Sequence, residues 1–119
     1  MKKEQYEELL NEWKIRLGLH DWRISLVPQC KPEDMSIEEA NGAVVWEESS
    51  KTARVEILDE KHYGSQLEPF DWEEILVHEL LHLKLCLLSE EDNKLLERII
   101  HILIDDLARA FVDAKRKGE

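Results

Sequence analysis

Residues 77–82 read VHELLH, and they lie within a longer run at 73–88, EEILVHELLHLKLCLL, that is otherwise almost wholly apolar. In a helix its leucines, isoleucine and valine point in every direction, and a helix that is apolar on all sides is normally buried. We therefore expect His78, Glu79 and His82 to lie away from solvent. Burying a carboxylate and two imidazoles without partners costs several kcal/mol, so these side chains need a ligand.

The spacing of the two histidines favours a metal ion as that ligand. Histidines at i and i+4 project from one helical face about 6 Å apart, so His78 and His82 can both reach one zinc ion. Glu79 is then rotated toward the open coordination position, where it can accept a proton from a zinc-bound water. HExxH has only three fixed positions, but its place on a helix predicted to be buried favours zinc over a chance match.

A catalytic zinc ion usually has three protein ligands, so one more residue is needed. The residues that follow His82, LKLCLLSEEDNK, contain neither a glycine nor a histidine, which excludes the extended HExxHxxGxxH form. If the chain reverses near residues 89–90, an antiparallel helix pair brings Glu97 level with His82. We therefore predict Glu97 as the third ligand, and the alternative is a solvated glutamate paired with Lys94 or His101.

Glu97 borders the apolar face of the last predicted helix. Counting equal numbers of residues on either side of the chain reversal also places His101 opposite His78. There it is a partner of a ligand, a substitute ligand or simply an exposed polar residue. The apolar face itself is formed by Leu96, Ile100, Leu103, Leu107 and Phe111.

Two further features could contribute to a site. His62 and Tyr63 precede the motif in a loop and could stabilise an oxyanion, although a loop tyrosine more often only packs. The edge of a strand predicted at 43–47 could pair with an extended peptide, as any exposed strand can.

The patterns along the chain predict one α+β domain over residues 1–119, with a small, mainly antiparallel, three-stranded sheet. Helical spacing of apolar residues, period-two alternation and turn residues define its elements. They are a helix at 3–17 stopped by Gly18, a strand at 22–26 ended by Pro28, a hairpin of 43–47 with 52–58, a helix at 71–88 and a last helix at 91–115 that packs antiparallel to it.

Composition limits the classes of function. The chain has 119 residues and a formal charge of -11, so its average field disfavours binding to nucleic acids or anionic membranes. No signal peptide or run long enough to span a bilayer is present, so we expect a cytoplasmic protein. Cys30 and Cys86 lack CxxC spacing, which excludes a four-cysteine zinc module within one chain. The oligomeric state stays open.

HELLH, followed by a short turn and ERIIHIL, resembles small zincin-fold metallopeptidase-like proteins of the minimal gluzincin and SprT-like kind, many of them encoded by phages and prophages. The order of an amphipathic helix ending in LGLHDWRISL, a small sheet, the HExxH helix and a supporting helix is also similar. The resemblance implies a zinc-dependent peptide hydrolase with His78, His82 and Glu97 as ligands and Glu79 as general base. The zinc ribbon and basic DNA-binding regions of full-length SprT-like proteins are lacking here.

Three hypotheses follow for the function. The first is a metallopeptidase that hydrolyses peptides or proteins with a zinc-activated water and Glu79. The second is a catalytically silent interaction module in which zinc, or merely the helix pair, is structural and the acidic surface binds a basic partner. The third is a helix-rich acidic binding protein without a metal.

Overall fold

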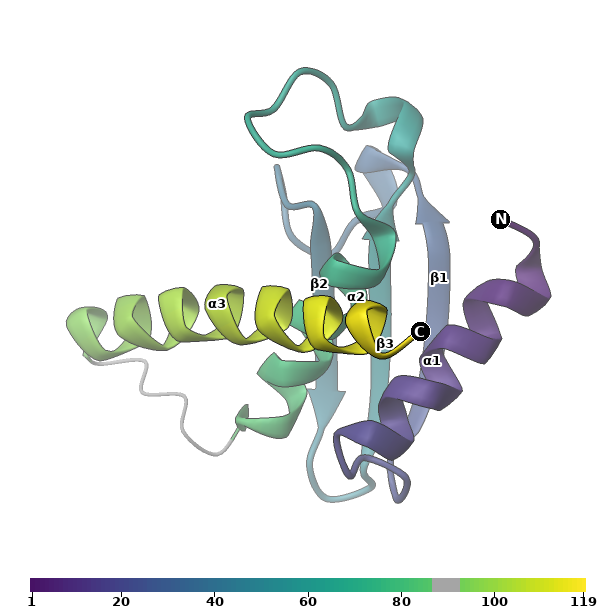
Figure 1. Cartoon of the computed structure of the whole chain (residues 1–119). Coiled ribbons are helices and arrows are strands. Elements are labelled where there is room, and N and C mark those ends of the chain that lie inside the picture. Colours follow the sequence, from purple (N-terminus) through teal and green to yellow (C-terminus); the bar gives the residue numbers. More distant parts are fainter. Residues whose placement is uncertain (87–92) are drawn as a thin grey trace.

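The computed structural model describes residues 1–86 and 93–119, and these form an α+β fold. Three helices lie on one side of a small mixed sheet of three strands (Figure 1). Two short 3-10 turns lie in the connections, at Pro32–Asp34 and Glu60–His62. The main elements are α1 (Lys3–Arg16), β1 (Arg23–Cys30), β2 (Gly42–Glu47), β3 (Thr52–Leu58), α2 (Trp72–Lys84) and α3 (Lys94–Gly118).

The sheet has the strand order β1-β3-β2, which makes it mixed rather than mainly antiparallel. The hairpin predicted at 43–47 and 52–58 is confirmed, because β2 pairs with β3 in antiparallel register from Glu47↔Thr52 to Gly42↔Ile57. β1, however, pairs with the far side of β3 in parallel, starting at Arg23↔Thr52. The prediction of a mainly antiparallel sheet is therefore wrong for one of its two strand pairs.

β1 continues through Pro28, so the prediction that this strand ends there is also wrong. The physical reason is its position at the edge of the sheet, where a residue without a backbone N–H is tolerated. The pairing with β3 is irregular between Val27 and Cys30, and this irregularity accommodates the proline.

α1 begins and ends close to the predicted helix at 3–17. Gly18 follows it with φ +68°, a left-handed conformation that glycine adopts without steric cost and that commonly terminates helices. Tyr6, Leu10 and Trp13 form its buried face. They join the core beside α2 and the sheet.

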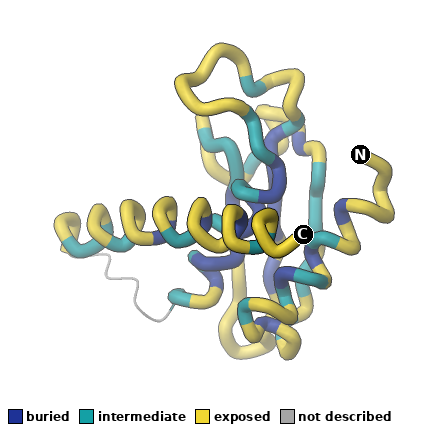
Figure 2. Tube along the Cα trace, viewed as in Figure 1, coloured by how far each residue is buried: buried dark blue, intermediate teal, exposed yellow. Residues whose placement is uncertain are grey.

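α2 lies between the sheet and α3, and it contacts both layers (Figure 1). Asp71 caps its N-terminus by accepting a hydrogen bond from the backbone N–H of Glu74, as the predicted capping pattern implies. The helix ends at Lys84, and residues 87–88 of the predicted helix lie outside the described residues. Both faces of α2 are lined with buried leucine and valine, which confirms the expectation of a buried helix (Figure 2).

α3 crosses α2 in antiparallel order, so that the start of one helix contacts the end of the other. Arg116, near the end of α3, forms an ion pair with Asp71 at the start of α2. Nε of Arg109 lies 3.6 Å from Oε1 of Glu74. Further along the helix pair, Asp105 contacts His78. Residues 91–92 of the predicted last helix lie outside the described residues. None of the helices in the described part of the chain combines the length and apolar character that crossing a membrane requires.

The core-facing side of α3 is not the predicted one. Ile104, Ala108 and Val112 are its buried residues, whereas Leu103 and Phe111 of the predicted apolar face are exposed. Each buried residue follows a residue of the predicted face by one position. Because helical neighbours are 100° apart, the buried stripe is rotated by more than a quarter of a turn from the predicted face. Part of the apolar surface of α3 is thereby left in solvent (Figure 2).

Candidate metal centre

Three histidines from two helices converge on one point. His78 and His82 come from successive turns of α2, and His101 comes from α3. One ring nitrogen of each lies within 4.8 Å of those of the other two. The Nε2 atoms of His78 and His82 are 3.1 Å apart. Two nitrogens on a tetrahedral zinc ion at the usual bond length are about 3.3 Å apart, so the histidine pair already has nearly the geometry of a metal site.

The carboxylate of Asp105 sets the orientation of His78. Its Oδ1 lies 2.7 Å from Nδ1 of the imidazole. An ionised carboxylate can only accept a hydrogen bond, so Nδ1 carries the proton and Nε2 presents its lone pair toward the other histidines. Carboxylates hold metal-binding histidines in this way in many metalloproteins.

Glu97 lies one helical turn before His101, and it is not in the group of three. It is half-buried and lines a cavity of about 80 Å³ together with His82, His101 and Cys86. The prediction that Glu97 is a ligand therefore stays a prediction. The described geometry instead places His101, which the sequence left as one of three possibilities, beside the histidine pair.

The structure brings His101 rather than Glu97 beside the histidine pair because α3 packs on α2 one helical turn away from the predicted position. The pairing expected from the sequence puts His82 beside Glu97 and His78 beside His101. In the structure, His82 lies beside His101, with ring centroids 4.7 Å apart, and His78 contacts Asp105. Each partner on α3 is thus four residues later than expected, which is about one helical turn. The predicted reversal at residues 89–90 lies outside the described residues.

Glu79 is the buried acidic group of the centre. Only 7% of the residue is exposed, and no hydrogen bond or ion pair with the other described residues satisfies its carboxylate. Gly42 at the start of β2 lies directly over it, and a Cβ atom built there would meet Glu79 Oε2 at 2.9 Å and Ile75 at 2.8 Å. Glycine at position 42 is therefore what allows the strand to approach the carboxylate so closely.

Burial shifts the titration of these groups strongly. It raises the pKa of Glu79 to about 8, with a further contribution from the negative charge of Asp105. It lowers the pKa of His82 to about 4, and the neighbouring His78 and His101 add to this effect. The pKa of His78 is also lowered by burial, although Asp105 opposes the shift. Both imidazoles of α2 are neutral at pH 7, which is the state that binds metal ions.

A cavity of about 550 Å³ opens onto the three histidines and Glu79. The strand β2 forms one wall through alternate residues Gly42, Val44 and Trp46, all on the side that faces α2. Trp46 is 37% exposed and lines the cavity, so it is not the core residue that its type suggests. The charged side chains that line the cavity include Glu68, Glu74 and Asp105.

Tyr63 and His62, the loop residues predicted to stabilise an oxyanion, occupy different positions relative to the cavity. Tyr63 lines the cavity, but its hydroxyl donates a hydrogen bond of 2.7 Å to the backbone carbonyl of Glu68. His62 is exposed in the turn Glu60–His62 and is not among the described residues that line the cavity. The Tyr63 hydroxyl is thus occupied by a backbone carbonyl, and the oxyanion role of both residues stays a prediction.

Asp105 and Gly42 are the site residues that sequence reasoning missed. Asp105 stands four residues after His101, on the same face of α3, and this i, i+4 pair is a signal that could have indicated it. Gly42 was interpreted only as part of a turn, because nothing local to Asn41-Gly42 shows that Glu79 lies beneath it.

Compared with known proteins, the chain matches no family model, no curated protein and no solved structure. Its function is therefore inferred from the chemistry and geometry of the site.

Proposed function

We propose that this protein is a zinc-dependent metallopeptidase with a zincin-like fold, in which His78, His82 and His101 hold the metal ion. The observation that carries the proposal is the convergence of three imidazoles beside a buried, unpaired glutamate at one end of a cavity. The resemblance of HELLH and its flanking elements to small gluzincin and SprT-like proteins supports the same reaction class.

The residues of the centre fit a zinc ion in chemistry as well as in spacing. Nitrogen ligands are among those that zinc prefers, and three protein ligands leave the fourth position open, as in catalytic sites. The depressed pKa values of His78 and His82 keep their nitrogens unprotonated. The unpartnered carboxylate of Glu79 would gain a nearby positive charge, which lowers the cost of its ionisation.

The proposed mechanism assigns each residue a task. A zinc ion bound here would acidify a water molecule and polarise the scissile carbonyl. Glu79, held beneath Gly42, accepts the proton of that water at a carboxylate oxygen and later delivers it to the departing amide nitrogen. Asp105 keeps His78 in the tautomer whose Nε2 faces the metal.

The edge of β2 supplies a place for the substrate. β2 pairs with β3 on one side only, and its residues Gly42, Val44 and Trp46 border the cavity. An extended peptide could add to this edge as a further strand, with its backbone held by hydrogen bonds and its carbonyls passing Glu79. The edge of β2 would thus be the route by which a protein segment reaches the centre, as the proposed peptidase activity requires.

A second candidate is the catalytically silent, zinc-stabilised interaction module, and the position of Glu97 favours it. Glu97 lines the small cavity next to His82 and His101. If its carboxylate joined the three imidazoles, the ion would have four protein ligands, and such closed sites are structural. The acidic surface would then bind a basic partner.

One set of measurements on the purified protein separates these readings. We expect about one zinc ion per chain, an X-ray absorption spectrum with three imidazoles and one water, and hydrolysis of a denatured protein substrate. Glu79→Gln should keep the zinc and lose the hydrolysis, whereas His78→Ala should lose both. Hydrolysis that survives Glu79→Gln would contradict the mechanism, four protein ligands without hydrolysis would favour the silent module, and a melting temperature insensitive to chelators would favour a protein without a metal.

A further inference from the structure

An exposed apolar stripe runs along the N-terminal half of α3. Leu95, Ile99 and Ile102 lie at spacings of four and three residues, so they share one face of the helix. Their exposed fractions are 69%, 52% and 54%, and the neighbouring Leu103 is 48% exposed. The stripe is opposite to Ile104 and Ala108, which face the core.

Among residues 1–86 and 93–119, α3 packs against α2, on the side opposite to the stripe. Figure 1 shows the beginning of α3 extending past the sheet and α2, away from the rest of the fold. Single exposed apolar residues are normal on protein surfaces, but a contiguous group of four large aliphatic side chains marks an interaction site. What covers it must present a complementary apolar face of similar length.

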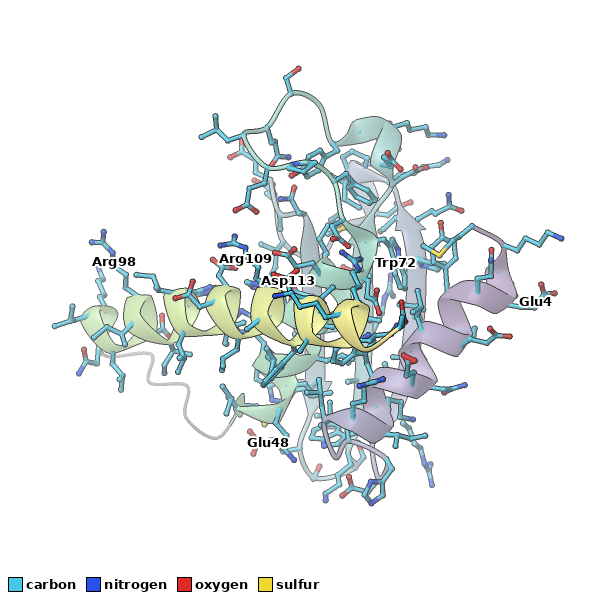
Figure 3. All side chains as sticks on the ribbon, viewed as in Figure 1. Glu4, Glu48, Trp72, Arg98, Arg109 and Asp113 are labelled. Carbon is cyan, nitrogen blue, oxygen red and sulfur yellow. The ribbon has the colours of Figure 1, made fainter. Side chains whose placement is uncertain are left out.

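The charges that flank the stripe indicate the occupant. Lys94 and Arg98 lie at its N-terminal end, whereas Asp105 and Asp106 lie toward its C-terminal end. Within residues 1–86 and 93–119, neither Arg98 nor Asp106 has an ion pair. Arg98 stands clear of the fold on the projecting part of the helix (Figure 3). A basic side chain at one end of the stripe and an acidic side chain at the other make the stripe complementary to a second copy of itself running in the opposite direction.

We propose that two copies of this chain associate through α3, with the two helices antiparallel about a twofold axis near Ile102. Ile99, Ile102 and Leu103 form the apolar centre of the contact. Arg98 is four residues before Ile102 and Asp106 is four after it, so Arg98 of each copy lies opposite Asp106 of the other. Four opposite charges thus flank the centre of the contact as two ion pairs.

Other occupants fit the observations less well. An anionic membrane surface is disfavoured by the formal charge of -11 and by the aspartates along the stripe. The proposed dimer does not rest on the proposed peptidase activity, because neither the three histidines nor Asp105 is among its contact residues, which are Arg98, Ile99, Ile102, Leu103 and Asp106. The association can accordingly be tested in metal-free and zinc-loaded protein alike.

Sedimentation equilibrium of the full chain at physiological salt tests the proposal. We expect a concentration-dependent monomer–dimer equilibrium that Ile99→Glu or Ile102→Glu weakens by about tenfold or more, since each change acts twice in a symmetric dimer. Ile15→Glu is the matched control, because Ile15 is 73% exposed on α1 and outside the stripe. A monomer at every concentration, or equal effects of Ile15→Glu and Ile102→Glu, would overturn the proposal.

A charge exchange tests the antiparallel register. Arg98→Asp or Asp106→Arg alone should weaken the dimer, because each places like charges opposite one another, and the double variant should restore it. These side chains are exposed, so folding, followed by circular dichroism, should be unchanged. A double variant no tighter than the single variants would overturn the register.

Discussion

His101 is the residue on which the construction of the centre depends. We expect His101→Ala to lower zinc affinity by more than the roughly 10–100-fold that loss of a residue supporting a ligand costs. Glu97→Ala should lower it less, because His101 and not Glu97 lies within reach of the histidine pair. Isothermal titration with zinc measures both. The reverse order of the two effects would instead make Glu97 the third ligand, as the sequence predicts.

Asp105 acts through His78, and a conservative change reveals this. Asp105→Asn keeps the shape of the side chain but removes the charge that fixes the Nδ1–H tautomer. We expect zinc affinity to fall about 10–100-fold while the stoichiometry at saturating zinc stays the same. Asp113→Asn, an exposed site on the same helix, is the control. An affinity unchanged in Asp105→Asn would mean that the contact does not orient His78.

Glu79 makes the stability of the metal-free protein depend on pH. Its folded pKa of about 8 is above the value in the unfolded chain, so the unfolded state gains stability by ionising as the pH rises from about 4.5 to 8. Glu79→Gln removes this effect. We expect the variant to be more stable than the parent by a few kcal/mol at pH 8, with little difference at pH 4.

Urea unfolding at a series of pH values after chelation measures that difference. Exposed Glu7→Gln should give no such trend. A constant difference between Glu79→Gln and the parent from pH 4 to pH 8 would rule out the buried carboxyl as its source.

At the scale of single residues, the motif was predictable and its surroundings were not. His78, Glu79 and His82 follow from a pattern within one helix, where spacing alone sets geometry. The positions of His101 and Asp105 relative to the motif depend on the register in which α3 packs on α2. An error of one helical turn in that register moves every predicted partner by four residues. Gly42 depends on a contact between a strand and a helix that are 37 residues apart at Glu79, for which the sequence has no local signal.

Among the elements, α1, α2 and α3 are joined by a buried lysine. The side chain of Lys115 is 7% exposed and lies 2.8 Å from Glu12 of α1 and 2.5 Å from Glu73 of α2. Glu73 also accepts a hydrogen bond of 2.7 Å from the indole of Trp13. We expect Lys115→Ala to reduce the free energy of unfolding by about 2 kcal/mol, because the buried carboxylate of Glu73 loses its nearest cation and keeps only the longer contact with Arg116.

Chemical denaturation of Lys115→Ala, compared with the exposed neighbour Lys117→Ala, tests that expectation. The control should change stability by no more than about 0.5 kcal/mol. Equal small effects would show that water replaces the lysine at little cost.

The helices and the hairpin were predictable because their signals are local. A cap at Asp71 and a left-handed Gly18 mark helix ends, and two alternating runs separated by a short turn mark the hairpin. The parallel pairing of β1 with β3 carries no such signal, since the partners are far apart in sequence. The prediction that β1 ends at Pro28 failed for the same reason. Whether a strand lies at an edge, where proline is tolerated, is a property of the sheet and not of the strand's own sequence.

For the molecule as a whole, zinc would link α2 to α3 and stabilise the fold. At a free zinc concentration about 100 times the Kd, we expect a gain of about 2.7 kcal/mol in the free energy of unfolding and a rise of roughly 10 °C in Tm. Differential scanning calorimetry with and without a chelator measures the change. His82→Ala should abolish it, and a rise that persists in this variant would place the metal elsewhere.

The strand order β1-β3-β2 also has a consequence for the order in which the domain assembles. The hairpin of β2 and β3 closes over a few residues, whereas the parallel register Arg23↔Thr52 closes a far longer loop. Loop-closure entropy therefore favours the hairpin as the earlier structure, with β1 added afterwards. The strand that carries Gly42 would then be in place before α2 docks on it, so that Glu79 is desolvated against a surface already formed.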